Sequence, residues 1–401
     1  MWLLLACTAP PTPIAARPTT DDDPSADPVE TIAGETPAEI DPFADTGVLA
    51  LGVELSAAAI AQLEGAPTEY VPGALIWGGE RYEPVGIRLK GNSTYQWLDG
   101  RPAWKVKFDE YIPGLRVWGL ERLTLDSNYW DGSMMAETLA YRVFRRAGNP
   151  APRTGYAQVR LNGELLGLYT VVESMDDGFV EAWWPDSEGG LYEMCRSCDF
   201  NLDCSGYELQ ETGENFDPSG LSRACDAAAT GDEAAIRAHF DWDRLVRYMA
   251  LERVVNHADS YSYNRNNYYV YHDPLDDRLT LTPWGADSTF SYSYPPDEDR
   301  PCEPGYFDNL ASDPGAWLAS WCLQTPSCWA DVETEMTRLG QLLVEEDLAG
   351  FVDITHDRIA DAVAADPTWP WGLDTWEEKV DCFGRWIEDR PAQIEAFVAA
   401  R

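Results

Sequence analysis

Residues 256–287 read NHADSYSYNRNNYYVYHDPLDDRLTLTPWGAD, and this stretch predicts a β-hairpin with polar residues at its base. Two runs rich in aromatic and β-branched side chains, which favour strands, flank an Asp- and Pro-rich turn at residues 273–278. Because a hairpin returns the chain to the place where it began, Asp259 and Asn267 before it and Asp287 after it are expected to converge.

These three side chains predict a site for a divalent cation. Two carboxylates and an amide oxygen are hard ligands of the kind that Mg²⁺ takes, and Mg²⁺ often shares them with substrate phosphates. One of the carboxylates could instead orient a hydroxyl nucleophile. Enzymes that transfer phosphoryl groups use the same order of residues: an Asp and an Asn, a short hairpin, and then a second Asp. Phosphoryl transfer needs mainly positioning and charge neutralisation, so few side chains suffice.

The pattern around this segment predicts one α+β domain from about residue 45 to the end of the chain. Asp131 is expected to cap a long amphipathic helix, and Asn162-Gly163 is a strong signal for a second hairpin. The segment 186–228, which carries four cysteines, is interpreted as a loop-like insertion that is peripheral to the chemistry. The expected strands are 74–77, 82–89, 104–108, 157–161, 166–172, 267–271 and 279–283; the expected helices are 132–147, 242–255 and most of the last hundred residues.

Composition excludes several classes of protein. Among 401 residues, 69 are acidic and 29 are Lys or Arg, which gives a net charge of −40. A field of that sign repels polyphosphates, so it argues against nucleic-acid binding and against adhesion to anionic membranes. The 17 Trp, 19 Tyr and 12 Phe supply enough aromatic mass for a large core, which excludes wholesale disorder.

The N-terminus indicates export. Leu4-Leu5-Ala6-Cys7 resembles the lipobox of bacterial lipoproteins, so residues 1–7 are interpreted as a signal remnant, with a lipid on Cys7 as the only membrane anchor. The stretch lacks a basic region, so either translation begins upstream or the apolar start is a coincidence. Residues 8–44 are rich in Pro, Thr, Ala and Asp, which predicts a disordered tether.

The remaining eight cysteines suit the same location. An even number in loop-like contexts predicts up to four disulfides in an oxidising compartment, in the periplasm or at the cell surface. A zinc site built on Cys195 and Cys198, with Cys204 and Cys225, is the alternative.

Taken in order, the motifs resemble those of the CotH kinase family, which is named for a spore coat protein. The matching segments are 85–93 (VGIRLKGNS), 105–108 (KVKF), 120–128, 131–135, 151–153, 159–163, 167–173, 190–192, 266–271 and 283–287. The resemblance implies an atypical protein-kinase-like fold, here with a disulfide-stapled insertion. It also implies ATP and Mg²⁺ as cofactors, and transfer of the γ-phosphoryl group to a Ser or Thr hydroxyl of a protein substrate at the cell envelope.

The resemblance also implies a role for individual residues. The catalytic residues would be Asp259 and Lys107, and the metal ligands would be Asn267 and Asp287. The nucleotide would be bound by Lys90, Asn92, Ser93, Glu137 and Glu173, with Arg88 as a neighbour.

One departure opens an alternative function. The family usually has Trp-Asp-x-Asp where this chain has Trp284-Gly285-Ala286-Asp287, so one acid is missing. If the missing acid were essential, the protein would be a pseudokinase, that is, a non-catalytic structural protein of the envelope or surface.

Overall fold

The computed structural model describes residues 41–44, 47–91, 95–195, 197–201, 204–213, 216–290, 308–310 and 312–401. The chain divides into Met1–Ala38 and Glu39–Arg401, and all described residues lie in the second unit. The expected signal remnant, most of the expected tether, Asn92 and Ser93 therefore lie outside the described residues. Phe43, at the end of the expected tether, is buried in the core, so ordered packing begins before residue 45.

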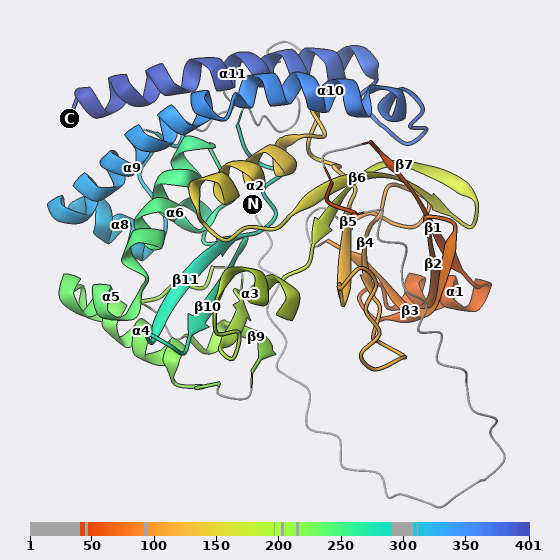
Figure 1. Ribbon diagram of the computed structural model, residues 1–401, viewed down its shortest axis with the longest axis horizontal. Helices are drawn as coiled ribbons and strands as arrows, with labels where there is room; N and C mark the ends of the chain where they lie inside the picture. The colour runs from red at the N-terminus through yellow and green to blue at the C-terminus, as the bar shows by residue number, and fades with distance from the viewer. Residues whose placement is uncertain are drawn as a thin grey trace, which may run out of the picture. The chain divides into compact units, whose positions relative to one another are not determined.

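The first half of the described chain forms a closed barrel (Figure 1). Its strands follow the order β1-β2-β3-β4-β5-β7-β6, and parallel pairing of β1 with β6 closes it. On β4, Trp104 and Val106 point into the barrel and are fully buried, whereas Lys105 and Lys107 point outward. The strands are β1 (Leu49–Leu55), β2 (Val71–Trp77), β3 (Glu80–Lys90), β4 (Ala103–Lys107), β5 (Arg122–Asp126), β6 (Thr154–Leu161) and β7 (Glu164–Glu173).

Two helices belong to this part of the chain: α1 (Ala57–Gly65) packs on the barrel, and α2 (Ala136–Ala147) packs with α6 and α9 in the core of the second half. The expected start of α2 at residue 132 is wrong, because Met134 takes a positive φ of 57° and the chain turns before the helix begins. Asp131 nevertheless accepts hydrogen bonds from the backbone N–H groups of Ser133 (2.9 Å) and Ala136 (2.7 Å), so it satisfies amides at the helix start.

The second half is built on a four-stranded sheet in the order β11-β10-β8-β9. The hairpin of β10 (Tyr268–Asp273) and β11 (Arg278–Pro283) is the one expected from the sequence. The interpretation of residues 186–228 as a peripheral loop is wrong, because this segment supplies β8 (Gly190–Glu193) and β9 (Glu208–Thr212), which complete the sheet. Four-residue and five-residue strands are too short to show a clear alternation in sequence.

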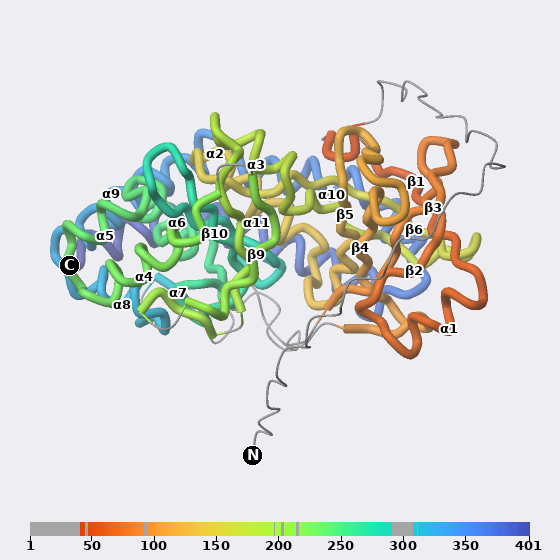
Figure 2. Tube along the Cα trace, turned by 90° about the horizontal axis from the view of Figure 1, so that it is seen from below, coloured from red at the N-terminus to blue at the C-terminus, as the bar shows by residue number. Residues whose placement is uncertain are grey.

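Helices cover the sheet and join the two halves. Figures 1 and 2 show the barrel strands at one end of this unit and α4, α5 and α8 at the other. None of the described helices is long and apolar enough to cross a membrane. The remaining helices are α3 (Asp177–Trp183), the 3₁₀ turn Cys204–Gly206, α4 (Gly220–Thr230), α5 (Glu233–His239), α6 (Trp242–Val254), α7 (Tyr261–Asn264), α8 (Trp317–Gln324), α9 (Pro326–Glu345), α10 (Leu348–Ala364) and α11 (Leu373–Ala399).

The cysteines form disulfides, as expected, rather than the alternative zinc site. The bonds are Cys195–Cys198, Cys204–Cys225 and Cys322–Cys328, and Cys382 is disulfide-bonded as well.

Candidate active site

Three asparagine amides hold the Asp259 carboxylate in the loop between α6 and β10. Asn266 Nδ2 and Asn267 Nδ2 each donate to Asp259 Oδ2 at 2.9 Å, and Asn264 Nδ2 donates to Oδ1. The single turn of α7 and the positive φ values of Arg265 (52°) and Asn267 (53°) fold the loop back on itself. The amide nitrogen of Asn267 therefore faces Asp259, and its carbonyl oxygen is the atom left for another ligand.

The two ends of the hairpin meet, as the sequence predicts. Asn267 Nδ2 lies 3.4 Å from the carbonyl oxygen of Gly285, and the Ala258 N–H donates to the Ser288 carbonyl at 2.9 Å. Asp287 lies between these contacts and is partly buried. Burial, followed by the negative charge of Asp126, raises the pKa of Asp287 to about 7. The charge of Asp259 contributes in the same direction, so the two carboxylates are close enough to interact.

A lysine reaches this acidic region from the end of β3. Lys90 Nζ lies 2.7 Å from Asp126 Oδ2 and 5.5 Å from the centre of the Trp284 ring. Burial lowers the pKa of Lys90, but the charges of Asp126, Glu137 and Asp287 outweigh it, so the net direction is upward. Burial likewise opposes ionisation of Asp126, but the Lys90 ammonium beside it brings its pKa below the ordinary value.

Glu137 enters the same cluster from the first turn of α2. Burial and the neighbouring Asp126 raise the pKa of Glu137 to about 8, against the opposing effect of Lys90. Its Oε1 accepts a hydrogen bond from the Tyr141 hydroxyl at 2.9 Å. Its Oε2 is buried and has no hydrogen-bond partner among the described residues. Its raised pKa therefore favours the neutral form of Glu137 near neutral pH.

Two of the residues expected at this site form ion pairs with other residues. Lys107 Nζ pairs with Glu110 at 3.0 Å. It stands at the end of β4 opposite to Ala103, which is the residue that pairs with Lys90. Glu173 is engaged by Arg153, whose guanidinium lies 2.7 Å from Glu173 Oε1. The lysine that reaches Asp287 and Glu137 is Lys90, since the pairing of β3 with β4 places it nearer to them.

Asp126 is a member of the cluster that sequence reasoning missed. It ends the short strand Arg122–Asp126, in which Leu123 and Leu125 point into the barrel, so the two-residue period places Asp126 on the outer face. That alternation was readable in the sequence, but nothing local indicated a lysine opposite it.

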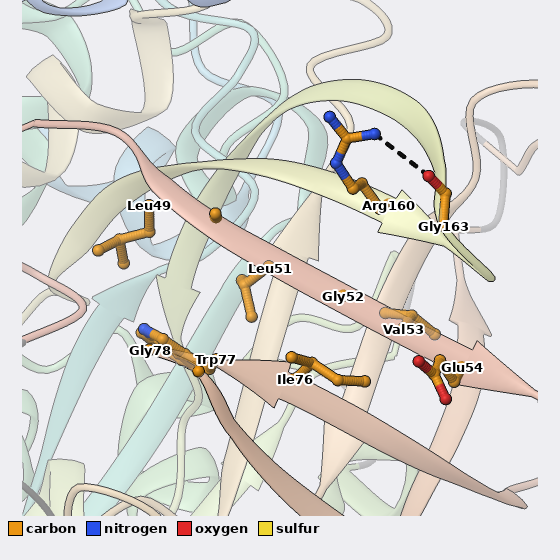
Figure 3. A pocket seen from close by; sticks show the side chains of 12 residues that line it. Leu49, Leu51, Gly52, Val53, Glu54, Ile76, Trp77, Gly78, Arg160 and Gly163 are labelled. Carbon is orange, nitrogen blue, oxygen red and sulfur yellow. Dashed lines mark hydrogen bonds between the residues drawn. The ribbon is translucent and has the colours of Figure 1, made fainter.

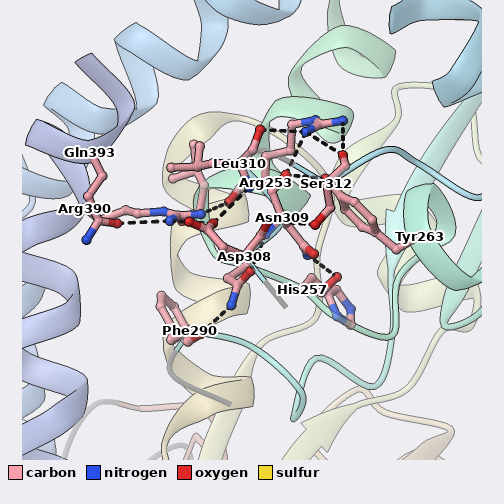
Figure 4. Close-up of polar contacts among 12 residues, drawn as sticks. Arg253, His257, Tyr263, Phe290, Asp308, Asn309, Leu310, Ser312, Arg390 and Gln393 are labelled. Atoms are coloured by element: carbon pink, nitrogen blue, oxygen red, sulfur yellow. Dashed lines mark hydrogen bonds and ion pairs between the residues drawn. The ribbon is translucent and has the colours of Figure 1, made fainter. Parts of the chain in front are cut away.

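A buried polar network links Arg390, Arg253, Asn309 and His257 (Figure 4). Arg390 of α11 donates to the carbonyl oxygens of Arg253 (2.5 Å) and Val254 (3.1 Å) at the end of α6. Arg253 donates to the Asn309 carbonyl at 2.7 Å, and Asn309 Nδ2 donates to the His257 carbonyl at 2.9 Å. The C-terminal helix thereby fixes the backbone two residues before Asp259.

The residues of the cluster fit a magnesium–phosphate group better than a metal held by protein alone. Within the described ranges, no three His, Cys, Asp or Glu side chains are arranged to hold a metal ion. Mg²⁺ commonly uses one or two carboxylates together with substrate phosphates, which is what Asp287 and the Asn267 oxygen can offer. The carboxylates of Asp126, Asp259 and Asp287 also outnumber Lys90, so their charge favours a bound cation.

A groove of about 520 Å³ on the outside of the barrel is a less suitable site (Figure 3). It lies over β1 and β2, with Glu54 and Arg160 as its charged lining residues, and Arg160 donates to the Gly163 carbonyl at 3.2 Å. It has no pair of carboxylates and no unpaired base, so it lacks groups for acid–base or metal chemistry.

Comparison with known proteins identifies relatives over most of the chain. The family model described as "CotH kinase protein" matches residues 87–394. The chain is 23% identical over 246 residues to "Invasin CotH7" of Rhizopus delemar, covering 57% of this chain and 41% of that protein. It is 24% identical over 181 residues to "Inner spore coat protein H" of Bacillus subtilis, covering 41% of this chain and 49% of that protein. The chain therefore spans less than half the length of these relatives.

Two solved structures are also similar. One is the Helicobacter pylori proinflammatory kinase CtkA, at 10% identity and a TM-score of 0.31, covering 82% of this chain and 93% of that one. The other is from the Shewanella oneidensis HipA, HipB and operator DNA complex, at 11% identity and a TM-score of 0.36, covering 92% and 75%.

Proposed function

This chain belongs to the CotH kinase protein family, and from that premise we propose that it transfers the γ-phosphoryl group of ATP, with Mg²⁺, to a Ser or Thr hydroxyl of a protein. The observation that carries the proposal is the meeting of two groups of residues. Asp259 and Asn267 are joined by a hydrogen bond on one side, and on the other Asp287 lies close enough to Lys90, Asp126 and Glu137 for their charges to interact. In a kinase-like fold the barrel would be the nucleotide-covering half.

Each residue has a role that its surroundings support. Lys90 is the cation for the nucleotide phosphates, and Glu137 and Asp126 orient its ammonium group. Asp287 and the carbonyl oxygen of Asn267 are the ligands for Mg²⁺, which when bound neutralises phosphate charge. Asp259, immobilised by three amides, orients the acceptor hydroxyl and accepts its proton.

The glycine at the position of the missing family acid has a structural reason. Gly285 has a φ of +51°, and a Cβ there would lie 3.1 Å from both Cγ and Oδ1 of Asn267. A side chain at residue 285 would be strained and would displace Asn267. Asp126 lies close to Lys90 and Asp287, so the site has another carboxylate beside Asp287 although residue 285 is not acidic.

The disulfides support the location that we propose, and the net charge bears on the partner. Three disulfides among the described residues suit an oxidising compartment, so we propose an exported protein of the periplasm or cell surface, anchored by a lipid on Cys7. Its partner would be a protein substrate of the envelope. The net charge of −40 disfavours nucleic acid as a partner.

A phosphotransfer assay on the full chain tests the proposal. With γ-labelled ATP and Mg²⁺, we expect Asp259→Ala and Asp287→Ala each to lower autophosphorylation and labelling of an acceptor protein by about 100-fold or more. Asp276→Ala, an exposed acid in the turn between β10 and β11, is the matched control. Equal labelling by all four proteins would refute the assignment of the site.

The second candidate function is a non-catalytic surface or envelope scaffold, and the observation that favours it is Gly285 in place of an acid. Thermal unfolding with and without ATP·Mg²⁺ separates the two. A nucleotide at ten times its Kd stabilises the native state by about 1.4 kcal/mol. Clear stabilisation favours the kinase, and none at millimolar nucleotide favours the scaffold.

A further inference from the structure

A disulfide closes a tight turn shortly after β8. Cys195 and Cys198 are bonded at a sequence separation of 3, and the Cys198 N–H donates to the Cys195 carbonyl at 3.0 Å. Ser197, which lies within this Cys195–Cys198 turn, has a positive φ of 71°. A residue with a Cβ rarely takes that conformation unless its surroundings impose it. We therefore expect the crosslink to keep the turn in a shape that the open chain would hold less well.

The Cys195–Cys198 turn contacts the loop at Asp259. The Ser197 N–H donates to the carbonyl oxygen of Arg265 at 3.0 Å. Arg265 directly follows α7 and has a positive φ of 52°. It lies between two of the asparagines whose amides hold the Asp259 carboxylate. The hydrogen bond thus joins two backbone positions with uncommon conformations, and one of them belongs to the loop itself.

Asp199, the residue after the turn, makes a second contact with the same loop. Its side chain is buried, and its Oδ1 accepts a hydrogen bond from the Tyr261 hydroxyl at 3.0 Å. Its Oδ2 accepts from the Trp317 N–H, at the start of α8, at 2.7 Å. Tyr261 is the first residue of α7 and Arg265 follows its last, so one short segment holds this helix at both ends.

We propose that the Cys195–Cys198 turn and Asp199 position the loop at Asp259, and that its asparagine amides stay aligned only while both contacts are made. A single helical turn such as α7 has too few hydrogen bonds to keep its shape by itself, so its outside contacts decide how well it is ordered. The catalytic consequence rests on the proposed function, in which Asp259 orients the acceptor hydroxyl. Asp199 and Tyr261 are then positioning residues, because they act through the amides and do not touch the substrate.

Hydrogen–deuterium exchange of the full chain tests the two contacts without requiring catalysis. Tyr261→Phe deletes one hydroxyl and keeps the ring, and the double variant C195S/C198S opens the turn. In both proteins we expect the amides of residues 259–267 to exchange about tenfold faster or more, because this segment loses a contact that opposes its local opening. The amides of β10 and β11 should change by less than about twofold.

Each variant has a matched control that should leave exchange at residues 259–267 within about twofold of wild type. Tyr271→Phe also removes a buried hydroxyl, one that donates to the Asp186 carbonyl at 2.8 Å from the part of β10 away from the loop. C322S/C328S also removes a disulfide, one that links the end of α8 to the start of α9.

Steady-state phosphotransfer separates positioning from a general loss of structure. Tyr261→Phe should lower kcat by about tenfold or more and leave KM for ATP within about twofold, because the proposed nucleotide cation, Lys90, lies on the barrel. A raised KM with unchanged kcat would overturn the proposal. Unchanged exchange at residues 259–267 in both variants, or an equal increase in β10 and β11, would overturn it as well. If wild type transfers no phosphate, the proposed function fails, whereas faster exchange confined to residues 259–267 still supports the positioning of the loop.

Discussion

Replacing Glu137 with Gln should remove a pH-dependent loss of stability. The carboxyl group is buried, and its pKa in the folded protein is raised from 4.5 to about 8. The folded state therefore binds a proton that the unfolded state releases between these values, and stability falls as pH rises through this window. Each pKa unit corresponds to about 1.4 kcal/mol. Between pH 5 and 8 the contribution of Glu137 should thus decrease by about 4 kcal/mol.

The Glu137→Gln variant is nearly isosteric and keeps an acceptor for the Tyr141 hydroxyl, which now bonds Oε1 at 2.9 Å. The assay is urea denaturation of wild type and variant at several pH values from 5 to 9. The free energy of unfolding of the variant minus that of wild type should rise by about 1.4 kcal/mol per pH unit up to about pH 8 and then level off. Glu64→Gln, on the exposed side of α1, is the control. Parallel curves for wild type and Glu137→Gln would refute the placement of a neutral carboxyl beside Lys90.

Three further predictions concern the support of the site. Arg390→Met should destabilise the protein by about 3–5 kcal/mol in urea denaturation, because it removes a buried charge with several hydrogen bonds; a change below about 1 kcal/mol would argue against the network. Replacing Cys204 and Cys225 with Ser opens a link with a sequence separation of 21 and should cost about 3 kcal/mol, compared under oxidising conditions; equal midpoints would contradict this. Gly285→Asp should lower Tm and fail to raise phosphotransfer, since its side chain meets Asn267 in a left-handed backbone; increased labelling would show that the missing acid is what limits activity.

The loop at Asp259 shows how far local reasoning reaches. Two runs rich in aromatic and β-branched residues and a polar turn predict the β10–β11 hairpin, and that hairpin brings Asp259 and Asn267 near the segment that carries Asp287. The disulfides follow similarly from an even number of cysteines, although their pairing does not. Where elements are short, as β8 and β9 are, the periodic signal is too brief, and residues 186–228 were misread as a loop.

The amino-acid sequence by itself determined where the predicted hairpins turn and which residues share the loop at Asp259, because these features depend on neighbours within about ten positions. Only the tertiary structure decided that Lys90 rather than Lys107 meets the acidic cluster, and that Asp126 belongs to it. Lys90 and Asp126 are 36 residues apart in sequence but 2.7 Å apart in space. Such contacts depend on the register between paired strands and on the closure of the barrel. Both are set by residues far apart in the sequence, so no local pattern predicts them.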